Sequence, residues 1–378
     1  MRIAIDINGI FERGSGLGRY IKSLVKILSS IDAENEYFLY LHYFNMPKNL
    51  EQLRCSLPDN FKVICKKIPE TISLISEHIF GLQLTDFLLR GYKIDIFHGP
   101  ANLIPIFKDV RTILTVHHYL PAWHPLYPKA LSWRENLYFR LTDDSIKKAD
   151  FIITDSESTK NDIMKTFNID MNKVLSIYPG EPDPIFKPMD FTCIGIPKYI
   201  LFSGPINERK NLPNLLRAFK IVKKKFQDYK LVITGGGKME YIATIKDFAK
   251  NLGLENEVIF MGTVDDVKMA ELYNSAALLV YPSLYEGFGY PPLEAMSCGC
   301  PVVASNVTSI PEIVGDAAIL FDPCNIEEMA QAMERVLKDS NLRKVLVERG
   351  FEQVKKFSWE KTARETIEVY RKVYNLKK

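Results

Sequence analysis

Residues 277–299 read ALLVYPSLYEGFGYPPLEAMSCG, which is a short apolar run followed by a loop and the start of a helix. The run ends at Pro282, and two glycines then open a loop whose backbone can approach a ligand closely. The two prolines that follow preset the first turn of a helix, which Gly299 closes. A buried strand that leads through a loop into a helix is the repeating unit of a parallel α/β sheet.

The same unit recurs along the whole chain. Short runs of Val, Ile, Leu and Phe alternate with longer amphipathic segments, a pattern that predicts buried parallel strands covered by helices on both faces. We therefore predict an α/β fold with two Rossmann-like, doubly wound domains that face each other across a crevice. The expected strands are Arg2–Ile7, Tyr37–Tyr43, Phe61–Cys65, Ile94–His98, Thr112–His117, Phe151–Thr154, Lys173–Tyr178, Tyr199–Ser203, Lys230–Thr234, Glu257–Met261, Ala277–Tyr281, Pro301–Ser305 and Ala318–Phe321.

The division into two domains follows from length and from proline content. A chain of 378 residues exceeds what one hydrophobic core usually fills. The proline-rich stretch 178–184, followed by Pro188 and Pro197, can continue neither a helix nor a central strand, so we place the interdomain linker there. The expected parts are a first Rossmann-like domain over 1–185, a second Rossmann-like domain over 186–357, and a C-terminal helix over 358–378 that crosses back to the first domain.

Composition excludes several classes of protein. The 47% hydrophobic and 25% charged residues are typical of an ordinary globular chain, and a net charge of +3 is too small to indicate nucleic-acid binding. The six cysteines form no C-x-x-C pair, so reduced thiols are favoured over zinc ligands. The N-terminus lacks the long apolar core of a signal peptide, and no window approaches 18 uninterrupted apolar residues. We expect a cytoplasmic protein that does not span a membrane.

Two glutamates stand out in the opening stretch. Glu286 lies in the glycine loop, and we expect Glu294 in the first turn of the helix that follows. A helix start offers backbone N–H groups and the positive end of a dipole, which suit a diphosphate. A carboxylate on each side can accept hydrogen bonds from hydroxyls of a sugar and a ribose. For either glutamate alone, an exposed loop acid or a residue that completes its own helix N-terminus is the favoured interpretation.

Two further loops of the second half also follow strands. In the stretch 203–211, Arg209 and Lys210 lie between a strand and a helix, where a pair of cations suits phosphate. A solvated basic turn is the alternative, and for an isolated pair it is favoured. The glycine run 234–238 is as compatible with a tight turn as with phosphate contact.

The first half offers weaker signals. Residues 14–20 contain a G-x-G-x-G run that departs from the dinucleotide fingerprint, so a nicotinamide enzyme is disfavoured. His117 and His118 end an apolar strand, where an imidazole would point into the crevice between domains. A lone histidine at a strand end is more often structural. For the loop 155–158, a helix cap is an equally good explanation.

Read together, these segments resemble the retaining glycosyltransferases of the GT-B fold in family 4 (group 1), which includes bacterial mannosyltransferases. The resemblance spans nearly the whole chain and rests on four blocks in the right order. These blocks are the N-terminal glycine loop at Gly16, the pair Arg209 and Lys210, the E-x7-E motif formed by Glu286 and Glu294, and the stretch Ile310–Asp316.

The resemblance implies a nucleoside-diphosphate sugar as co-substrate, no other cofactor, and a role for each matching residue. It implies catalytic roles for Glu286, Arg209 and Lys210, which would contact the donor sugar and neutralise the departing diphosphate. It also implies that His117 acts at the sugar. Most relatives have Asp where this chain has His118. The implied donor-binding residues are Gly16, Arg209, Lys210, Glu286, Gly287, Phe288, Gly289 and Glu294.

The expected function is retaining transfer of a hexose, foremost mannose from GDP-mannose, to a saccharide or a lipid-linked saccharide during polysaccharide biosynthesis. The alternatives are a UDP-hexose-dependent transferase of the same fold or a catalytically silent sugar-nucleotide-binding protein. No D-x-D motif is placed to hold a divalent ion, so we expect no metal. The resemblance makes 1–185 the acceptor-binding domain, with the segments 18–30, 72–92 and 119–148 as the places of contact, and 186–357 the nucleotide-sugar-binding domain. Aromatic and basic residues in 123–148 are compatible with peripheral contact at the inner face of the cell membrane. On these residues alone a helix that packs its aromatics into the core is favoured, and the resemblance shifts the balance towards membrane contact.

Overall fold

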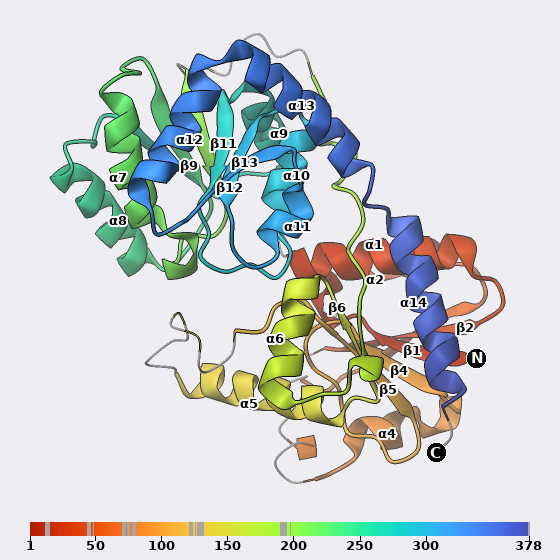
Figure 1. Cartoon of the computed structure of the whole chain (residues 1–378). Coiled ribbons are helices and arrows are strands. Elements are labelled where there is room, and N and C mark those ends of the chain that lie inside the picture. The colour runs from red at the N-terminus through yellow and green to blue at the C-terminus, as the bar shows by residue number, and fades with distance from the viewer. Residues whose placement is uncertain are drawn as a thin grey trace. The chain divides into compact units, whose positions relative to one another are not determined.

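The computed structural model divides the chain into two compact units (Figure 1). The first consists of Met1–Gly180 together with Ser358–Lys378, and the second is Glu181–Phe357. The structure therefore groups residues 181–185 with the second unit, whereas the sequence assigns them to the first. It describes residues 1–11, 16–43, 47, 49–69, 73, 76–77, 81–120, 124, 126, 132–189, 195–196 and 198–376.

A seven-stranded parallel sheet forms the centre of the first unit, in the order β3-β2-β1-β4-β5-β6-β7. Strand order reverses direction between β1 and β4, which is the switch point typical of a doubly wound sheet. Its central strands are buried on both faces, as their apolar runs require. The strands are β1 (Arg2–Asp6), β2 (Glu36–His42), β3 (Phe61–Lys66), β4 (Ile96–Gly99), β5 (Arg111–Val116), β6 (Phe151–Thr154) and β7 (Val174–Ser176).

Helices flank this sheet, and the last helix of the chain is one of them. Figure 1 shows α14 beside α1, and the ring of Trp359 on α14 lies 5.6 Å from that of Tyr20 on α1. Tyr370 of α14 is fully buried, so this helix forms part of the first unit's core. The helices are α1 (Gly16–Ile31), α2 (Leu50–Cys55), α4 (Leu84–Leu89), α5 (Trp133–Lys148), α6 (Glu157–Phe167) and α14 (Trp359–Tyr374), with short 3-10 turns at Asn8–Phe11, Arg90–Tyr92 and Met171–Lys173.

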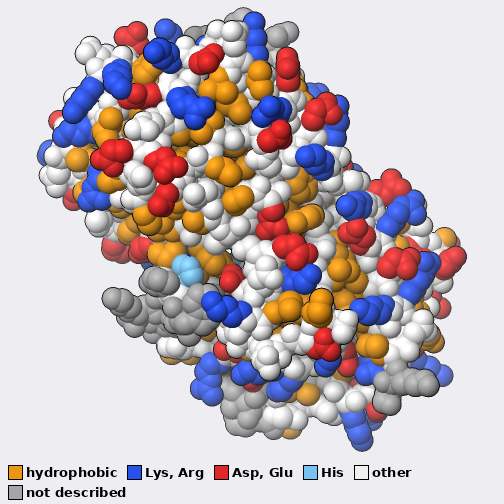
Figure 2. Space-filling view, in the orientation of Figure 1, with side chains coloured by type: hydrophobic (Ala, Val, Ile, Leu, Met, Phe, Trp, Pro, Cys, Tyr) orange, Lys and Arg blue, Asp and Glu red, His pale blue; other side chains and the backbone are white. Residues whose placement is uncertain are grey.

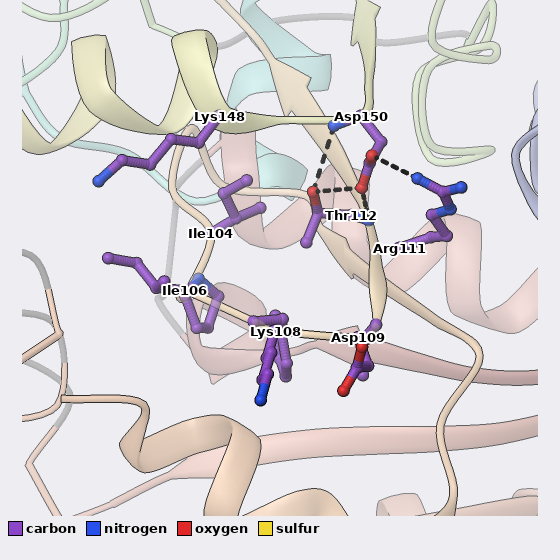
Figure 3. Close-up of a pocket in the computed structure, with 11 residues that line it drawn as sticks. Ile104, Ile106, Lys108, Asp109, Arg111, Thr112, Lys148 and Asp150 are labelled. Carbon is purple, nitrogen blue, oxygen red and sulfur yellow. Dashed lines mark hydrogen bonds and ion pairs between the residues drawn. The ribbon is translucent and has the colours of Figure 1, made fainter. Parts of the chain in front are cut away.

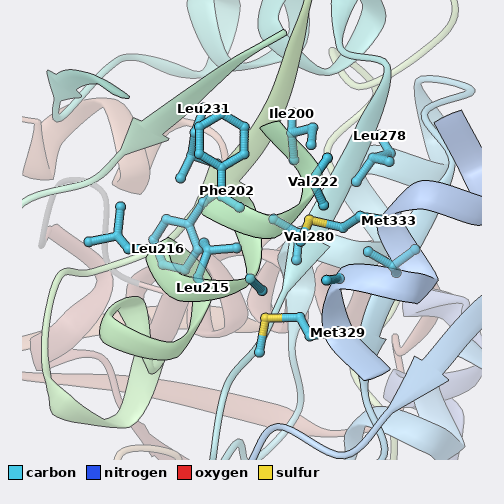
Figure 4. Packing of buried hydrophobic residues seen from close by; sticks show 14 of the residues in the cluster. Ile200, Phe202, Leu215, Leu216, Val222, Leu231, Leu278, Val280, Met329 and Met333 are labelled. Atoms are coloured by element: carbon cyan, nitrogen blue, oxygen red, sulfur yellow. The ribbon is translucent and has the colours of Figure 1, made fainter. Parts of the chain in front are cut away.

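The second unit repeats this plan with six parallel strands in the order β10-β9-β8-β11-β12-β13. Phe202, Leu215 and Met333 belong to the cluster that packs α7 and α12 onto the sheet (Figure 4). The strands are β8 (Tyr199–Ser203), β9 (Lys230–Thr234), β10 (Val258–Gly262), β11 (Leu278–Tyr281), β12 (Val302–Ser305) and β13 (Ala318–Phe321). The helices are α7 (Leu212–Lys223), α8 (Met239–Asn251), α9 (Asp266–Ser275), α10 (Tyr290–Ser297), α11 (Ile310–Val314), α12 (Ile326–Lys338) and α13 (Ser340–Val354), with a 3-10 turn at Glu208–Lys210.

The predicted fold class is confirmed, and all thirteen predicted strands are present with ends shifted by at most two residues. Buried parallel strands were predictable because they appear in the sequence as near-continuous apolar runs. On the face drawn in Figure 2, Lys and Arg side chains are interspersed with Asp and Glu, in line with the net charge of +3. Among the helices that the structure describes, none is long and apolar enough to cross a membrane.

Candidate functional site

The main polar cluster of the second unit lies where β8 and β11 end. These strands are neighbours in the sheet, and strand order reverses between them. The loop after β8 contains Arg209 and Lys210, and the loop after β11 contains Glu286. The two loops are joined by a backbone hydrogen bond of 2.8 Å from the N–H of Leu284 to the carbonyl of Arg209. The fold thus brings together two motifs that are far apart in the sequence.

Lys210 and Glu286 form a buried ion pair at this point. The Lys210 Nζ donates to Glu286 Oε1 at 2.5 Å and to the Tyr281 hydroxyl at 2.9 Å. It also lies 4.7 Å from the centre of the Tyr281 ring. The side chains of Lys210 and Glu286 are only 4% and 9% exposed, so Glu286 is not the exposed loop acid of the alternative interpretation.

Within this pair, the opposite charges counteract the effect of burial on both side chains. Burial by itself would raise the pKa of Glu286, but the charges of Lys210 and Arg209 outweigh it and hold the pKa below its ordinary value. Burial lowers the pKa of Lys210, and the adjacent Glu286 carboxylate opposes that shift. The site therefore holds a cation and a carboxylate in close contact, a donor and an acceptor for a polar ligand.

Residues just before α11 hold the Glu286 loop in place. The N–H of Glu286 donates to Thr308 Oγ1 at 3.0 Å. The Ser309 hydroxyl contacts the carbonyl oxygens of Glu286 at 3.1 Å and Phe288 at 2.8 Å. Thr308 adopts a left-handed backbone conformation, with φ of 54°. Thr308 and Ser309 directly precede the Ile310–Asp316 block. The N-terminal flank of this block therefore supports the Glu286 loop.

Glu294 lies on α10, but its position differs from the expected one. The helix begins at Tyr290 after Gly289, whose φ is 111°, so Glu294 belongs to the second turn rather than the first. It therefore does not complete its own helix N-terminus. Its buried carboxylate instead accepts a hydrogen bond of 3.1 Å from the Tyr273 hydroxyl on α9. The side chain is fixed by a neighbouring helix, which the sequence motif does not reveal.

The glycine run 234–238 serves loop packing. Gly235 has φ of 124°, and a Cβ there would lie 1.9 Å from the carbonyl oxygen of Gly204. The N–H of Ile206 donates to the carbonyl of Gly236 at 2.7 Å. Through these contacts, the loop after β9 packs directly against the loop that contains Arg209 and Lys210. A side chain at position 235 would therefore force the two loops apart.

In the first unit, His117 follows β5 and is held on both sides of its ring. Nδ1 lies 2.6 Å from Asp155 Oδ2, and Nε2 lies 2.7 Å from the carbonyl oxygen of Pro100. The backbone N–H of His117 donates to Asn102 Oδ1 at 3.0 Å. Both ring nitrogens of His117 therefore already have partners within the first unit.

Asp155 also determines the charge of His117. Burial would lower the pKa of His117, but the Asp155 carboxylate and the Pro100 carbonyl outweigh burial and raise it. The neighbouring Ser156 caps α6 by accepting from the N–H of Thr159, as the alternative interpretation of this loop proposes. The sequence thus identified the loop 155–158 but not the role of Asp155, because the partner of Asp155 is His117, which follows a different strand.

Gly16 and His118 complete the predicted residues of the first unit. Gly16 begins α1 and has open space where a Cβ would stand. One turn later, the ring of Tyr20 lies 4.7 Å from that of His117, so the start of α1 and the end of β5 lie at the same edge of the sheet. His118 is exposed. Residues 12–15, and parts of the segments 72–92 and 119–148, lie outside the described residues.

A separate pocket of about 500 Å³ lies at the opposite edge of this sheet (Figure 3). Lys108, Arg111, Lys148 and Asp150 are among the residues that line it. Asp150 pairs with Arg111 at 3.1 Å and accepts from the N–H of Thr112 at 2.8 Å. Ligands of doubly wound sheets bind at the carboxyl ends of the strands, so this pocket is distinct from the candidate site.

Comparison with known proteins gives matches along most of the chain. The family model described as glycosyltransferase family 4 matches residues 15–180, and the model described as glycosyl transferases group 1 matches residues 194–353. The O-antigen chain mannosyltransferase B of Escherichia coli is 29% identical over 94% of this chain and 96% of its own length. The serotype-specific mannosyltransferase WbdA of Escherichia coli is 30% identical over 73% of this chain, which spans only 36% of that relative.

Solved structures with the same architecture share little sequence with this chain. Sucrose-phosphate synthase from Thermosynechococcus elongatus aligns with a TM-score of 0.76 at 20% identity, covering 99% of both chains. Anabaena HepE, solved in complex with UDP-glucose, aligns with a TM-score of 0.71 at 16% identity, covering 98% of this chain and 100% of its own. At such identities these structures support the two-domain fold alone.

Proposed function

Because the chain belongs to the group 1 glycosyl transferases of family 4, we propose that it moves a hexose from a nucleoside-diphosphate sugar, with retention of configuration, to a saccharide or lipid-linked saccharide. That it is a glycosyltransferase follows from the family, while donor, acceptor and stereochemistry are our proposal. The observation that supports it most is the buried pair of Lys210 and Glu286 where β8 and β11 end. A cation and a carboxylate at that edge suit a diphosphate and a sugar respectively.

Within this proposal, each residue of the cluster has one task. Arg209 and Lys210 neutralise the diphosphate, and Glu286 accepts hydrogen bonds from hydroxyls of the donor sugar with help from the backbone of residues 287–289. Glu294, whose carboxylate is oriented by Tyr273, accepts from the ribose hydroxyls. We assign donor binding to the second unit and acceptor binding to the first, where Gly16 lies at the start of α1.

The chemical step needs no enzymatic nucleophile. The acceptor hydroxyl attacks the anomeric carbon from the face that the diphosphate leaves, through an oxocarbenium-like state. The bond from the anomeric carbon to the phosphate oxygen breaks, the bond to the acceptor oxygen forms, and the leaving diphosphate takes the hydroxyl proton. Arg209 and Lys210 stabilise the charge that develops on the diphosphate. Because two cations supply this stabilisation, we propose that no divalent metal is required.

Mannose is the preferred sugar of the proposal, and GDP-mannose the preferred donor. The two relatives described above are both named mannosyltransferases, and the one that matches 94% of this chain is named for the O-antigen chain. A UDP-hexose is the second candidate, since one protein of the same fold is solved with UDP-glucose.

A donor panel tests this proposal. The protein is incubated with GDP-mannose, GDP-fucose, UDP-glucose and UDP-galactose, with and without EDTA, and the release of nucleoside diphosphate is followed. We expect release from GDP-mannose that EDTA leaves unchanged, and a product whose anomeric configuration matches the donor. Absence of release and of binding for every donor would refute transfer from a sugar nucleotide. Dependence on Mg²⁺ or Mn²⁺ would refute the metal-free step.

We further propose peripheral contact of α5 with the cytoplasmic face of the cell membrane. Trp133 and Tyr138 on this helix are 68% and 42% exposed, and Arg140, Lys147 and Lys148 are exposed on it. Aromatic rings with basic neighbours suit an anionic interface. Sedimentation with phosphatidylglycerol vesicles should carry the protein down, and Trp133→Ala should weaken this. Equal sedimentation with purely zwitterionic vesicles would contradict an electrostatic contribution.

A further inference from the structure

The contacts of His117 determine its protonation state. Both of its ring nitrogens face acceptors, a carboxylate oxygen of Asp155 at 2.6 Å and the carbonyl oxygen of Pro100 at 2.7 Å. A neutral imidazole carries only one N–H and so could satisfy only one of the two. Two acceptors at these distances require two N–H donors, which makes the ring an imidazolium. No ring N–H is left over for a ligand.

The other groups described next to His117 supply no charge that would replace the Asp155 carboxylate as its partner. From α1, the Tyr20 ring packs edge-on against the imidazole. From β4, His98 is held by two hydroxyls, with Nδ1 2.8 Å from the Tyr370 hydroxyl and Nε2 2.7 Å from Thr115 Oγ1. His98 is fully buried and has no charged partner, so it stays neutral. His118, the next residue in the chain, is exposed.

Asp155 therefore supplies the carboxylate that balances His117. It follows β6, is buried, and lies 38 residues after its partner in the sequence. The resemblance leads one to expect Asp directly after the histidine, whereas this chain has the exposed His118 there. The carboxylate that contacts the ring thus comes from a neighbouring strand.

We propose that Asp155 is a positioning residue that keeps His117 doubly protonated and in one orientation. The ring of His117 then exchanges no proton during transfer, and its backbone is kept in one position next to Asn102. This inference rests on the proposed function, because the resemblance to glycosyltransferases is what gives His117 a role at the donor sugar. It agrees with a step in which the leaving diphosphate takes the acceptor proton.

The test compares two carboxylates at opposite ends of β6. Asp155→Asn keeps the shape but removes the charge next to His117. Asp150→Asn is the matched control, because Asp150 precedes β6, pairs with Arg111 and lies in the pocket of Figure 3. Protonation of His117 is followed by NMR of ¹⁵N-labelled histidine, with the signal assigned through His117→Gln. Steady-state rates with the active donor are measured from about pH 5.5 to about pH 8.5, a range that spans the ordinary histidine pKa.

For the wild-type protein we expect His117 to be an imidazolium at about pH 7, with its pKa above the ordinary histidine value. In Asp155→Asn the pKa of His117 should fall below 6.5, because burial then acts without the opposing charge. At about pH 7.5, kcat of this variant should be lower by about tenfold or more, and the loss should shrink towards about pH 5.5 as the ring regains its proton. Asp150→Asn should leave the His117 signals unchanged and the rate within about twofold.

Three outcomes would overturn the inference. One is a neutral His117 in the wild-type protein at pH 7, which needs no variant and no activity to observe. A second is an Asp155→Asn variant in which the pKa of His117 is lowered, while the ratio of the variant's rate to the wild-type rate is the same at every pH. The third is the same loss of rate in both variants. If no donor supports a rate at all, the proposed function fails instead, while the NMR titration still decides the Asp155 contact.

Discussion

The ammonium of Lys210 lies 2.5 Å from the carboxylate of Glu286, and their side chains are 4% and 9% exposed. Such a pair loses hydration when it is buried, and replacing it by apolar side chains is often neutral or stabilising. Its presence where β8 and β11 end is therefore better explained by ligand binding than by stability. A bound diphosphate and sugar hydroxyl would share the same two groups. The pair thus holds the site in a charged, oriented state before the donor arrives.

Removal of Glu286 should affect both stability and transfer. Glu286→Ala leaves Lys210 buried without its counter-ion, so we expect the free energy of unfolding to fall by about 3 to 5 kcal/mol. We expect the transfer rate to fall by about a hundredfold or more, since an oriented charged contact at the reacting sugar is lost. Denaturant unfolding and initial rates measure the two effects. Glu208→Ala is the matched control, as this exposed glutamate lies two residues from Lys210. A Glu286→Ala enzyme with the full transfer rate would exclude the assigned site.

Removal of both charges should be less harmful to stability than removal of one. In Lys210→Met/Glu286→Gln no uncompensated charge remains buried, so the double variant should be more stable than either single variant. A double-mutant cycle from denaturant unfolding gives the coupling energy, which must exceed the larger of the two single effects and which we therefore expect to be about 3 kcal/mol or more in favour of the pair. If the two single effects simply add, Lys210 and Glu286 do not interact in solution as they do in the structure.

The fold and the polar cluster after β8 and β11 were largely predictable from sequence, for two separate reasons. Buried parallel strands appear as apolar runs, and Arg209, Lys210 and Glu286 are charged residues at strand ends. The supporting contacts were not predictable. No local sequence pattern marks the supporting roles of Thr308, Tyr273 and Asp155. Their roles arise only when the sheet brings together segments that are 21 to 38 residues apart.

Close packing of the two loops after β8 and β9 predicts a cost for a side chain at Gly235. Gly235→Ala would place a Cβ 1.9 Å from the Gly204 carbonyl oxygen and would strain a backbone with φ of 124°. We expect a loss of about 2 kcal/mol or more in the free energy of unfolding, together with weaker donor binding. Gly91→Ala is the control, because no atom lies within 4 Å of its added Cβ. Equal stability of the two variants would show that the loops do not pack as described.

Two buried histidines predict acid sensitivity of the first unit. Burial lowers the pKa of His42 to about 4, and burial together with the charge of His117 lowers that of His98 to about 3, against 6.5 in the unfolded chain. Between these values the unfolded chain binds more protons, so the free energy of unfolding falls as pH decreases from 6.5 towards 4. Each histidine contributes up to about 1.4 kcal/mol per pH unit.

The slope of stability against pH is the measurement. Urea unfolding between pH 7 and pH 5 should show a shallower slope in His42→Gln than in the wild-type protein, whatever the absolute stability of the variant. An unchanged slope in His42→Gln would mean that His42 is not buried in its neutral form.

Calorimetric titration of GDP-mannose and UDP-glucose into the wild-type protein and into Lys210→Met/Glu286→Gln tests the central claim most directly. The claim is that this chain binds a sugar nucleotide through the buried pair after β8 and β11. We predict saturable binding of GDP-mannose to the wild-type protein and an affinity lower by about tenfold or more in the folded double variant, as loss of charged contacts implies. Binding of neither donor, or equal affinity of the two proteins, would contradict the account.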